Sequence, residues 1–145
     1  MRAKKILDLA DGFKRQWNTN DPYEIAERLG ITVLFRDTCP KDFTAQTLRA
    51  YSYPPVISIN DAYTESSKRL LCAHELGHAL LHENCVNYFA TTKSNVLQDV
   101  EREANLFALA LLLDDETRAS LTVPLCQMSN YLLRSIMEKN LKKSE

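Results

Sequence analysis

All three histidines of the chain lie within nine residues, in the segment His74-Glu-Leu-Gly-His-Ala-Leu-Leu-His82. In the pattern H-E-x-x-H the two histidines are four residues apart, so on a helix they are offset by about 40° and about 6 Å, and both rings can reach one metal ion. Glu75 lies about 100° further around the helix, where it can take a proton from a metal-bound water. The segment therefore predicts metal-assisted hydrolysis, with His74 and His78 as ligands and Glu75 as the general base.

A third ligand has to come from outside this helix. His82 follows His74 by eight residues, about 12 Å along a helix, which is too far for both to bind one ion at about 2.0–2.1 Å. The metzincin pattern would need a glycine and a histidine at the positions of Leu81 and Asn84, so that class is excluded. We therefore expect His82 to lie beside the site.

The next predicted helix offers two carboxylates. Glu103 lies on one flank of its apolar stripe and Glu101 on the other, and their positions on the helix only mildly favour Glu103 as a ligand. Both could instead face solvent. The stripe comprises Val96, Val100, Ala104, Phe107 and Leu111.

Two sequence blocks together carry a specific resemblance. Arg69-Leu-Leu-Cys-Ala-His-Glu-Leu-Gly-His-Ala-Leu-Leu-His82 is followed by Val100-Glu-Arg-Glu-Ala-Asn-Leu-Phe-Ala-Leu-Ala-Leu-Leu-Leu113. The chain resembles the ImmA/IrrE family of zinc metallopeptidases over roughly residues 20–113. The resemblance implies one zinc ion per chain, with His74, His78 and Glu103 as ligands and Glu75 as the catalytic base. It favours Glu103 over Glu101, and it places Asn105 beside a ligating imidazole.

The resemblance also implies an activity and a substrate class. It indicates an endopeptidase that cleaves a protein, with a helix-turn-helix repressor of a mobile element or stress regulon as the expected partner. The alternative is a noncatalytic zinc-bearing module that binds and sequesters a repressor. A further reading, nucleophilic hydrolysis by Cys85 with His82, has only their spacing of three residues in its favour. The residue that assists the oxyanion is left open among His82, Tyr63 and Tyr88.

The elements that must position these residues follow from periodicity and turn signals. We expect an α+β fold with zincin-like helices packed on a small, three-stranded, largely antiparallel sheet. The strand at 56–60 is expected to pair with an extended substrate segment. The predicted helices cover residues 3–17, 23–29, 64–82, 96–113 and 124–142, and the predicted strands cover 31–35, 47–53 and 56–60.

Length, charge and composition indicate how many domains the chain forms and argue against several other classes of protein. The 145 residues fit one metallopeptidase domain, residues 1–145, and the net charge of -1 argues against direct nucleic-acid binding. Residues 24–32 resemble the start of a helix-turn-helix, but the strand-forming run 31–35 occupies the place of its recognition helix. The longest apolar run, residues 106–113, is too short to span a membrane, where about 20 residues are needed. Four cysteines without a C-x-x-C pair indicate reduced thiols in a cytoplasmic protein.

Overall fold

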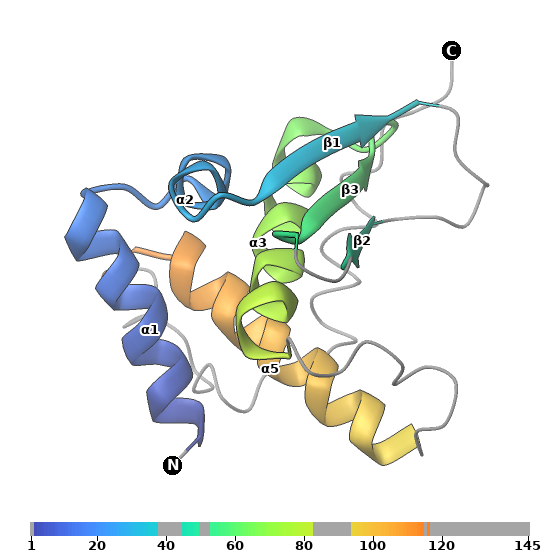
Figure 1. Ribbon diagram of the computed structural model, residues 1–145. Coiled ribbons are helices and arrows are strands. Elements are labelled where there is room, and N and C mark those ends of the chain that lie inside the picture. The colour runs from blue at the N-terminus through green and yellow to red at the C-terminus, as the bar shows by residue number, and fades with distance from the viewer. Residues whose placement is uncertain (1, 38–44, 50–52, 83–93, 115, 117–145) are drawn as a thin grey trace.

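The computed structural model describes residues 2–37, 45–49, 53–82, 94–114 and 116, and these form helices packed against one small sheet (Figure 1). The expected α+β class is confirmed. The helix expected at 124–142 lies outside the described residues. The described elements are α1 (Arg2–Trp17), α2 (Pro22–Arg28), β1 (Thr32–Arg36), β2 (Ala45–Leu48), β3 (Val56–Asn60), α3 (Glu65–Leu81) and α5 (Ser94–Leu112).

Local sequence explains where two helices begin. The Asp21 side chain accepts a hydrogen bond from the Tyr23 amide and caps α2, whose first residue is Pro22. The Thr64 hydroxyl accepts from the Ser67 amide in the same way and caps α3. These starts, and the extents of α1, α3 and α5, agree with the sequence-based prediction to within one or two residues.

The sheet is mixed rather than largely antiparallel. Its strand order is β1-β3-β2, with β1 parallel and β2 antiparallel to β3. Because β3 is hydrogen-bonded along both edges, the expectation that residues 56–60 pair with a substrate is wrong. Among the described residues, β2 pairs with a strand on one side only, and it contacts α3, the helix that carries the three histidines. The sheet edge that is open beside this helix therefore belongs to β2.

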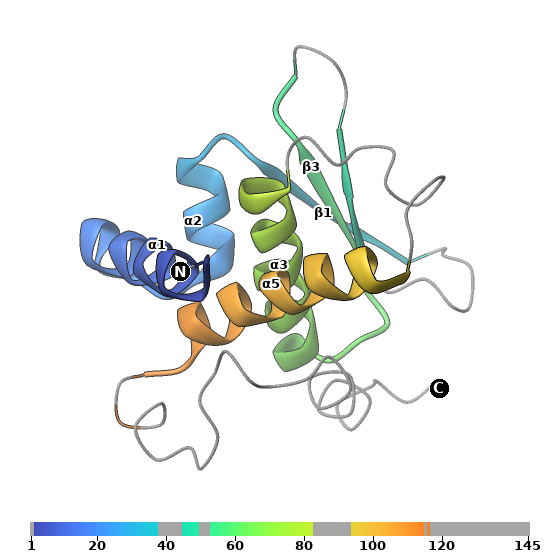
Figure 2. The same ribbon diagram turned by 90° about the horizontal axis from the view of Figure 1, so that it is seen from below.

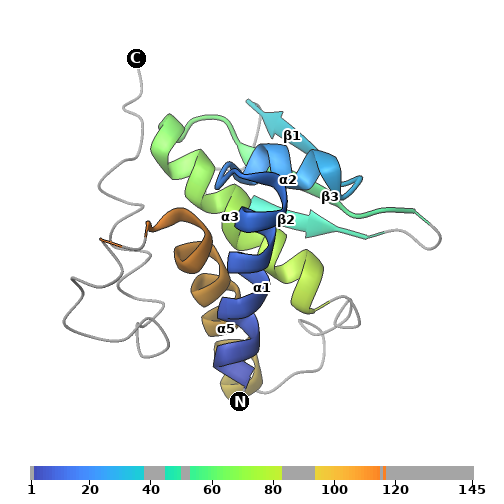
Figure 3. The ribbon, with the colours of Figure 1, turned by 90° about the vertical axis from the view of Figure 1, so that its left-hand side faces the viewer.

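Helix α3 is the central element of the fold. It packs against β2 and β3 on one side and against α5 on another, while α2 also contacts it (Figure 2). Helix α1 packs on α5 (Figure 3). The core between these layers includes the fully buried residues Ile57, Ile59, Leu76, Phe107 and Leu111.

A glycine in α3 permits the close approach of α5. A Cβ atom on Gly77 would lie 3.1 Å from both Cα and the carbonyl oxygen of Ala104, and 3.3 Å from Cβ of Phe107. Only a residue without a side chain fits this crossing without a shift of the partner backbone. This contact between the two helices determines which face of α5 lies against the histidines of α3.

None of the helices in the described ranges is long and apolar enough to cross a membrane.

Candidate metal centre

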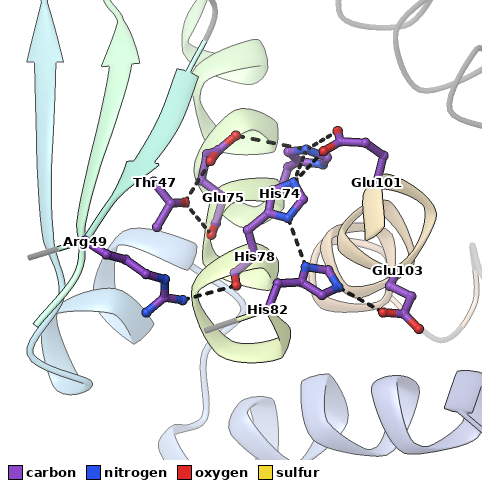
Figure 4. A network of polar contacts seen from close by, with 8 residues as sticks. All are labelled: Thr47, Arg49, His74, Glu75, His78, His82, Glu101 and Glu103. Carbon is purple, nitrogen blue, oxygen red and sulfur yellow. Dashed lines mark hydrogen bonds and ion pairs between the residues drawn. The ribbon is translucent and has the colours of Figure 1, made fainter. Parts of the chain in front are cut away.

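The three histidines form a row along α3. Successive rings lie 4.7 Å and 5.1 Å apart between centroids, for His74–His78 and His78–His82 respectively. All three side chains are largely buried, with exposed fractions of 13%, 15% and 6% in chain order. The row faces α5, as Figure 4 shows. The helical spacing of four residues thus brings the rings together as the sequence predicts.

Two of the rings converge with one carboxylate of α5. His74 Nε2 lies 3.2 Å from His78 Nε2, and the Glu101 carboxylate lies 3.1 Å from the first and 2.8 Å from the second. One ligand atom from each of these residues lies within 4.8 Å of the others. Among the described residues, this is the group of three side chains with the spacing to hold a metal ion.

The structure therefore differs from the expectation that Glu103 joins His74 and His78. Glu103 Oε1 lies 2.9 Å from His82 Nε2, at the end of α3, whereas Glu101 reaches both other histidines (Figure 4). The physical reason is the rotation of α5, which the contact of Gly77 with Ala104 sets. Glu101 precedes Ala104 by three residues and shares its face, which is the face toward α3. Helix periodicity alone could not supply this rotation.

Glu75 lies on the sheet side of the same helix. It is 7% exposed, and its Oε1 accepts a 2.8 Å hydrogen bond from the hydroxyl of Thr47 on β2. The same hydroxyl lies 3.1 Å from the Glu75 carbonyl oxygen, so Thr47 contacts this residue at two atoms. The other carboxylate oxygen, Oε2, lies 4.0 Å from His74 Nε2. Glu75 is thus held beside the cluster, with one oxygen bound by Thr47 and the other on the side of His74.

The neighbouring strand also secures the end of α3. Arg49, directly after β2, donates hydrogen bonds to the carbonyl oxygens of Ala79 at 2.6 Å and His78 at 3.4 Å. The His78 carbonyl also accepts from the His82 amide, whereas Ala79 belongs to the last turn, whose carbonyl groups have no partner within the helix. A cation there also interacts favourably with the helix dipole. Arg49 therefore stabilises the turn of α3 that carries His78 and His82.

The electrostatics of the cluster favour an ionised carboxylate. Burial of Glu101 raises its pKa, but the hydrogen bonds and charge interactions with His74 and His78 outweigh burial and hold the pKa well below its usual range. Burial lowers the pKa of His74, but the hydrogen bond to Glu101 and the charges of Glu75 and Glu101 raise it overall. The cluster thus attracts positive charge, either a proton or a metal ion.

The donor set suits a divalent transition metal, and zinc in particular. Two imidazole nitrogens and one carboxylate form a ligand set of catalytic zinc sites, which leaves a fourth position for water. Two tetrahedral ligands at about 2.0–2.1 Å are about 3.3 Å apart, close to the 3.2 Å between the two Nε2 atoms. The residues therefore fit the ion.

Sequence reasoning missed two contributors, Thr47 and Arg49. Neither belongs to a recognisable motif, and their roles depend on the pairing of β2 with β3, which brings a distant strand beside α3. The only available signal was the short β-forming segment before Pro54. Two residues of the sequence hypotheses, Cys85 and Tyr88, lie outside the described residues.

The thiol described in the structure has no place in this chemistry. Cys72 is fully buried on the opposite side of α3 from the histidine row, and burial is the main cause that raises its pKa to about 12. A thiol of that pKa is protonated and unreactive at neutral pH.

Comparison with known proteins places this geometry in a family. The chain is 32% identical over 105 residues to "Uncharacterized immunity region protein 2" of Bacillus phage phi105, an alignment that covers 70% of this chain and 63% of the relative. It is 33% identical over 115 residues to "Metallopeptidase ImmA" of Bacillus subtilis (strain 168), covering 79% of this chain and 66% of the relative. The chain thus spans slightly less than two thirds of each of these relatives. No solved structure matches it. The sequence profile of the family described as the IrrE N-terminal-like domain, peptidase family M78, matches residues 26–124, and the chain belongs to that family.

Proposed function

We propose that this chain is a zinc-dependent endopeptidase, with His74, His78 and Glu101 as zinc ligands and Glu75 as the general base. The observation that carries the proposal is the position of the buried Glu75 carboxylate, 4.0 Å from His74 Nε2 at the edge of the histidine–glutamate cluster. A site that only held a structural metal would not need a buried carboxylate beside its ligands. The family membership and the name of the Bacillus subtilis relative support the same activity.

The mechanism assigns each residue a task. When bound, zinc supplies a water of lowered pKa, near 7, and polarises the carbonyl of the bond to be cleaved. Glu75 accepts the proton of that water at Oε2 and then delivers it to the leaving amine. Thr47 holds Oε1 with its hydroxyl, which leaves Oε2 directed toward the cluster. The Glu75 carboxylate is in this way oriented before the substrate arrives.

The sheet offers a way to present a peptide. Strand β2 carries Thr47 and, within the described ranges, pairs with another strand along one edge only. An extended segment added to the open edge of β2 would be held by main-chain hydrogen bonds, without a demand for one side chain. Such a segment would run past Glu75, which supports cleavage within a chain.

For the substrate we propose a helix-turn-helix repressor, which a cytoplasmic peptidase would reach on or off DNA. The support is the resemblance to a family whose known members cleave such repressors, together with the immunity-region name of the phage relative. With a net charge of -1, the chain itself has no bulk positive field for DNA. The contact is therefore expected with the repressor protein.

The test compares wild type with Glu75→Gln, each loaded with one equivalent of zinc. The two proteins are incubated first with a peptide library made by digestion of a proteome, then with purified helix-turn-helix repressors of the host, and new amino termini are identified by mass spectrometry. We expect cleavage by wild type at bonds inside the peptides and none by Glu75→Gln, although both retain zinc. If both bind a repressor equally and neither cleaves, the sequestering module is correct and the peptidase is not.

A further inference from the structure

We propose that His82 and Glu103 form a hydrogen-bond relay that fixes the ring of His78 in the tautomer and orientation needed to bind zinc. The inference rests on the proposed function, because it gives His78 Nε2 to the metal. It assigns Glu103, placed outside the metal cluster, a role as a positioning residue. His82 is the link between the two.

Three contacts define the relay. His78 Nδ1 lies 3.0 Å from His82 Nδ1, and His82 Nε2 lies 2.9 Å from Glu103 Oε1. The opposite nitrogen of His78, Nε2, lies 2.8 Å from the Glu101 carboxylate and 3.2 Å from His74 Nε2. Figure 4 shows the connection running from the cluster along α3 and back to α5. His78 thus faces the metal cluster with one nitrogen and His82 with the other.

The positions of the hydrogens follow from chemistry. A ligating His78 has a free lone pair at Nε2 and so carries its hydrogen at Nδ1. That hydrogen is donated to His82 Nδ1, which must then be an acceptor, and neutral His82 carries its own hydrogen at Nε2. The Glu103 carboxylate accepts this hydrogen, because an ionised carboxylate only accepts. Each donor in the relay meets one acceptor. Because Glu103 can only accept, it determines that the hydrogen bonds run from His78 through His82 to Glu103.

The surroundings hold the relay in place. The His82 side chain is 6% exposed, and its backbone amide donates to the His78 carbonyl oxygen at 2.9 Å, so backbone and ring both tie it to His78. Arg49 donates to the carbonyl oxygens of the same turn. A partner that orients a ligating imidazole raises its basicity, and loss of such a partner costs about 10–100-fold in metal affinity or activity.

This arrangement also removes one open alternative. His82 was a candidate to assist the oxyanion of the substrate, which requires a free N–H directed at the reacting carbonyl. In the structure each ring nitrogen of His82 has a partner, His78 on one side and Glu103 on the other. His82 therefore acts through His78 and not on the substrate.

The first test reads the tautomers directly. Long-range proton–nitrogen correlation spectra of protein labelled with nitrogen-15 in histidine are recorded with one equivalent of zinc bound. We expect His82 with its hydrogen at Nε2 and His78 with its hydrogen at Nδ1. A His82 that carries its hydrogen at Nδ1, or at both nitrogens, would overturn the relay. This measurement needs no substitution and is therefore independent of variant folding.

The second test is a double-mutant cycle of zinc affinity, measured by competition with a chromophoric chelator. His82→Phe and Glu103→Ala should each weaken zinc binding about 10–100-fold, and the double variant should be no weaker than His82→Phe, because Glu103 acts only through His82. Glu103→Gln retains an accepting oxygen and should stay within about threefold of wild type.

The outcomes separate the relay from the proposed function. If wild type binds zinc and His82→Phe binds it equally well, the relay is wrong and the metal site stands. If Glu103→Ala weakens binding further in the His82→Phe background, Glu103 contacts the metal itself and the relay is again wrong. If wild type binds no zinc, the proposed function and the relay both fail.

Discussion

Gly77 of α3 and Ala104 of α5 meet where the two helices cross, and a Cβ atom on Gly77 would come within 3.1 Å of the Ala104 backbone. The contact lies between His74 and His78, the proposed ligands of α3, in sequence, and three residues after Glu101 on α5. The glycine of the His-Glu-Leu-Gly-His segment thus contributes to the proposed metal site through helix packing alone.

Replacement of this glycine should be costly in two ways. Gly77→Ala gains about 0.5–1 kcal/mol of helix propensity but forces α5 away, at a cost of about 1–3 kcal/mol. We expect lower stability in urea and weaker zinc binding. Gly12→Ala in α1 is the matched control, since its new Cβ meets nothing within 4 Å, and it should be neutral or stabilising. Zinc affinity unchanged in Gly77→Ala would contradict the structural role of the crossing.

The hydroxyl of Thr47 should matter for turnover and not for metal binding. Thr47→Val removes the donor to Glu75 Oε1 and is expected to lower kcat about 10–100-fold while zinc affinity stays unchanged. Thr47→Ser keeps the hydroxyl and should restore most of the rate. Gln46→Ala, at an exposed neighbouring position of β2, should have wild-type kcat. Equal rates for Thr47→Val and wild type would show that Glu75 needs no such orientation.

The cap that Arg49 provides should be visible in stability. Arg49→Ala leaves the carbonyl oxygens of His78 and Ala79 without this donor, and we expect a loss of about 1–2 kcal/mol in the free energy of unfolding. Lys4→Ala removes a solvent-exposed ion pair with Asp8 and should leave the free energy of unfolding nearly unchanged. Urea denaturation of both variants without zinc makes the comparison, and equal losses would argue against the cap.

The thiol of Cys72 should resist modification until the chain unfolds. Its pKa of about 12 leaves a thiolate fraction at pH 8 about a thousandfold below that of an ordinary thiol with a pKa of 9. Burial favours the protonated thiol in the folded state. The free energy of unfolding should therefore fall above pH 9, where the exposed thiol of the unfolded chain ionises. Iodoacetamide labelling followed by peptide mapping should show Cys72 modified only in urea. Rapid labelling of native protein would contradict its burial.

Much of the candidate site could be predicted from the sequence, because the spacing of residues along one helix determines which side chains lie together. His74, His78 and Glu75 all come from one nonapeptide on a single helix. The choice between Glu101 and Glu103 was not accessible in this way. Both flank one apolar stripe, and the packing of α5 against Gly77 decides which of them reaches His74 and His78.

The same holds for the sheet: the strands could be predicted from the sequence, but their pairing could not. The β-forming segments at 31–35 and 56–60 were recognisable from composition, and the structure has them as β1 and β3. Their parallel pairing depends on contacts between segments about 24 residues apart. The position of β3 at the centre, with β2 beside α3, is therefore a result of tertiary structure. It is also what brings Thr47 to Glu75.

The most direct test of the account is zinc affinity and zinc content of Glu101→Gln and Glu103→Gln, purified in parallel with wild type. Each variant replaces a glutamate of α5 by glutamine, and the two positions are two residues apart, so each variant is the control for the other. Glu101→Gln removes a ligand and should lower affinity at least about 100-fold, whereas Glu103→Gln keeps the acceptor for His82 and should hold one zinc per chain. The reverse result, with zinc lost from Glu103→Gln and kept by Glu101→Gln, would contradict the metal centre described by His74, His78 and Glu101.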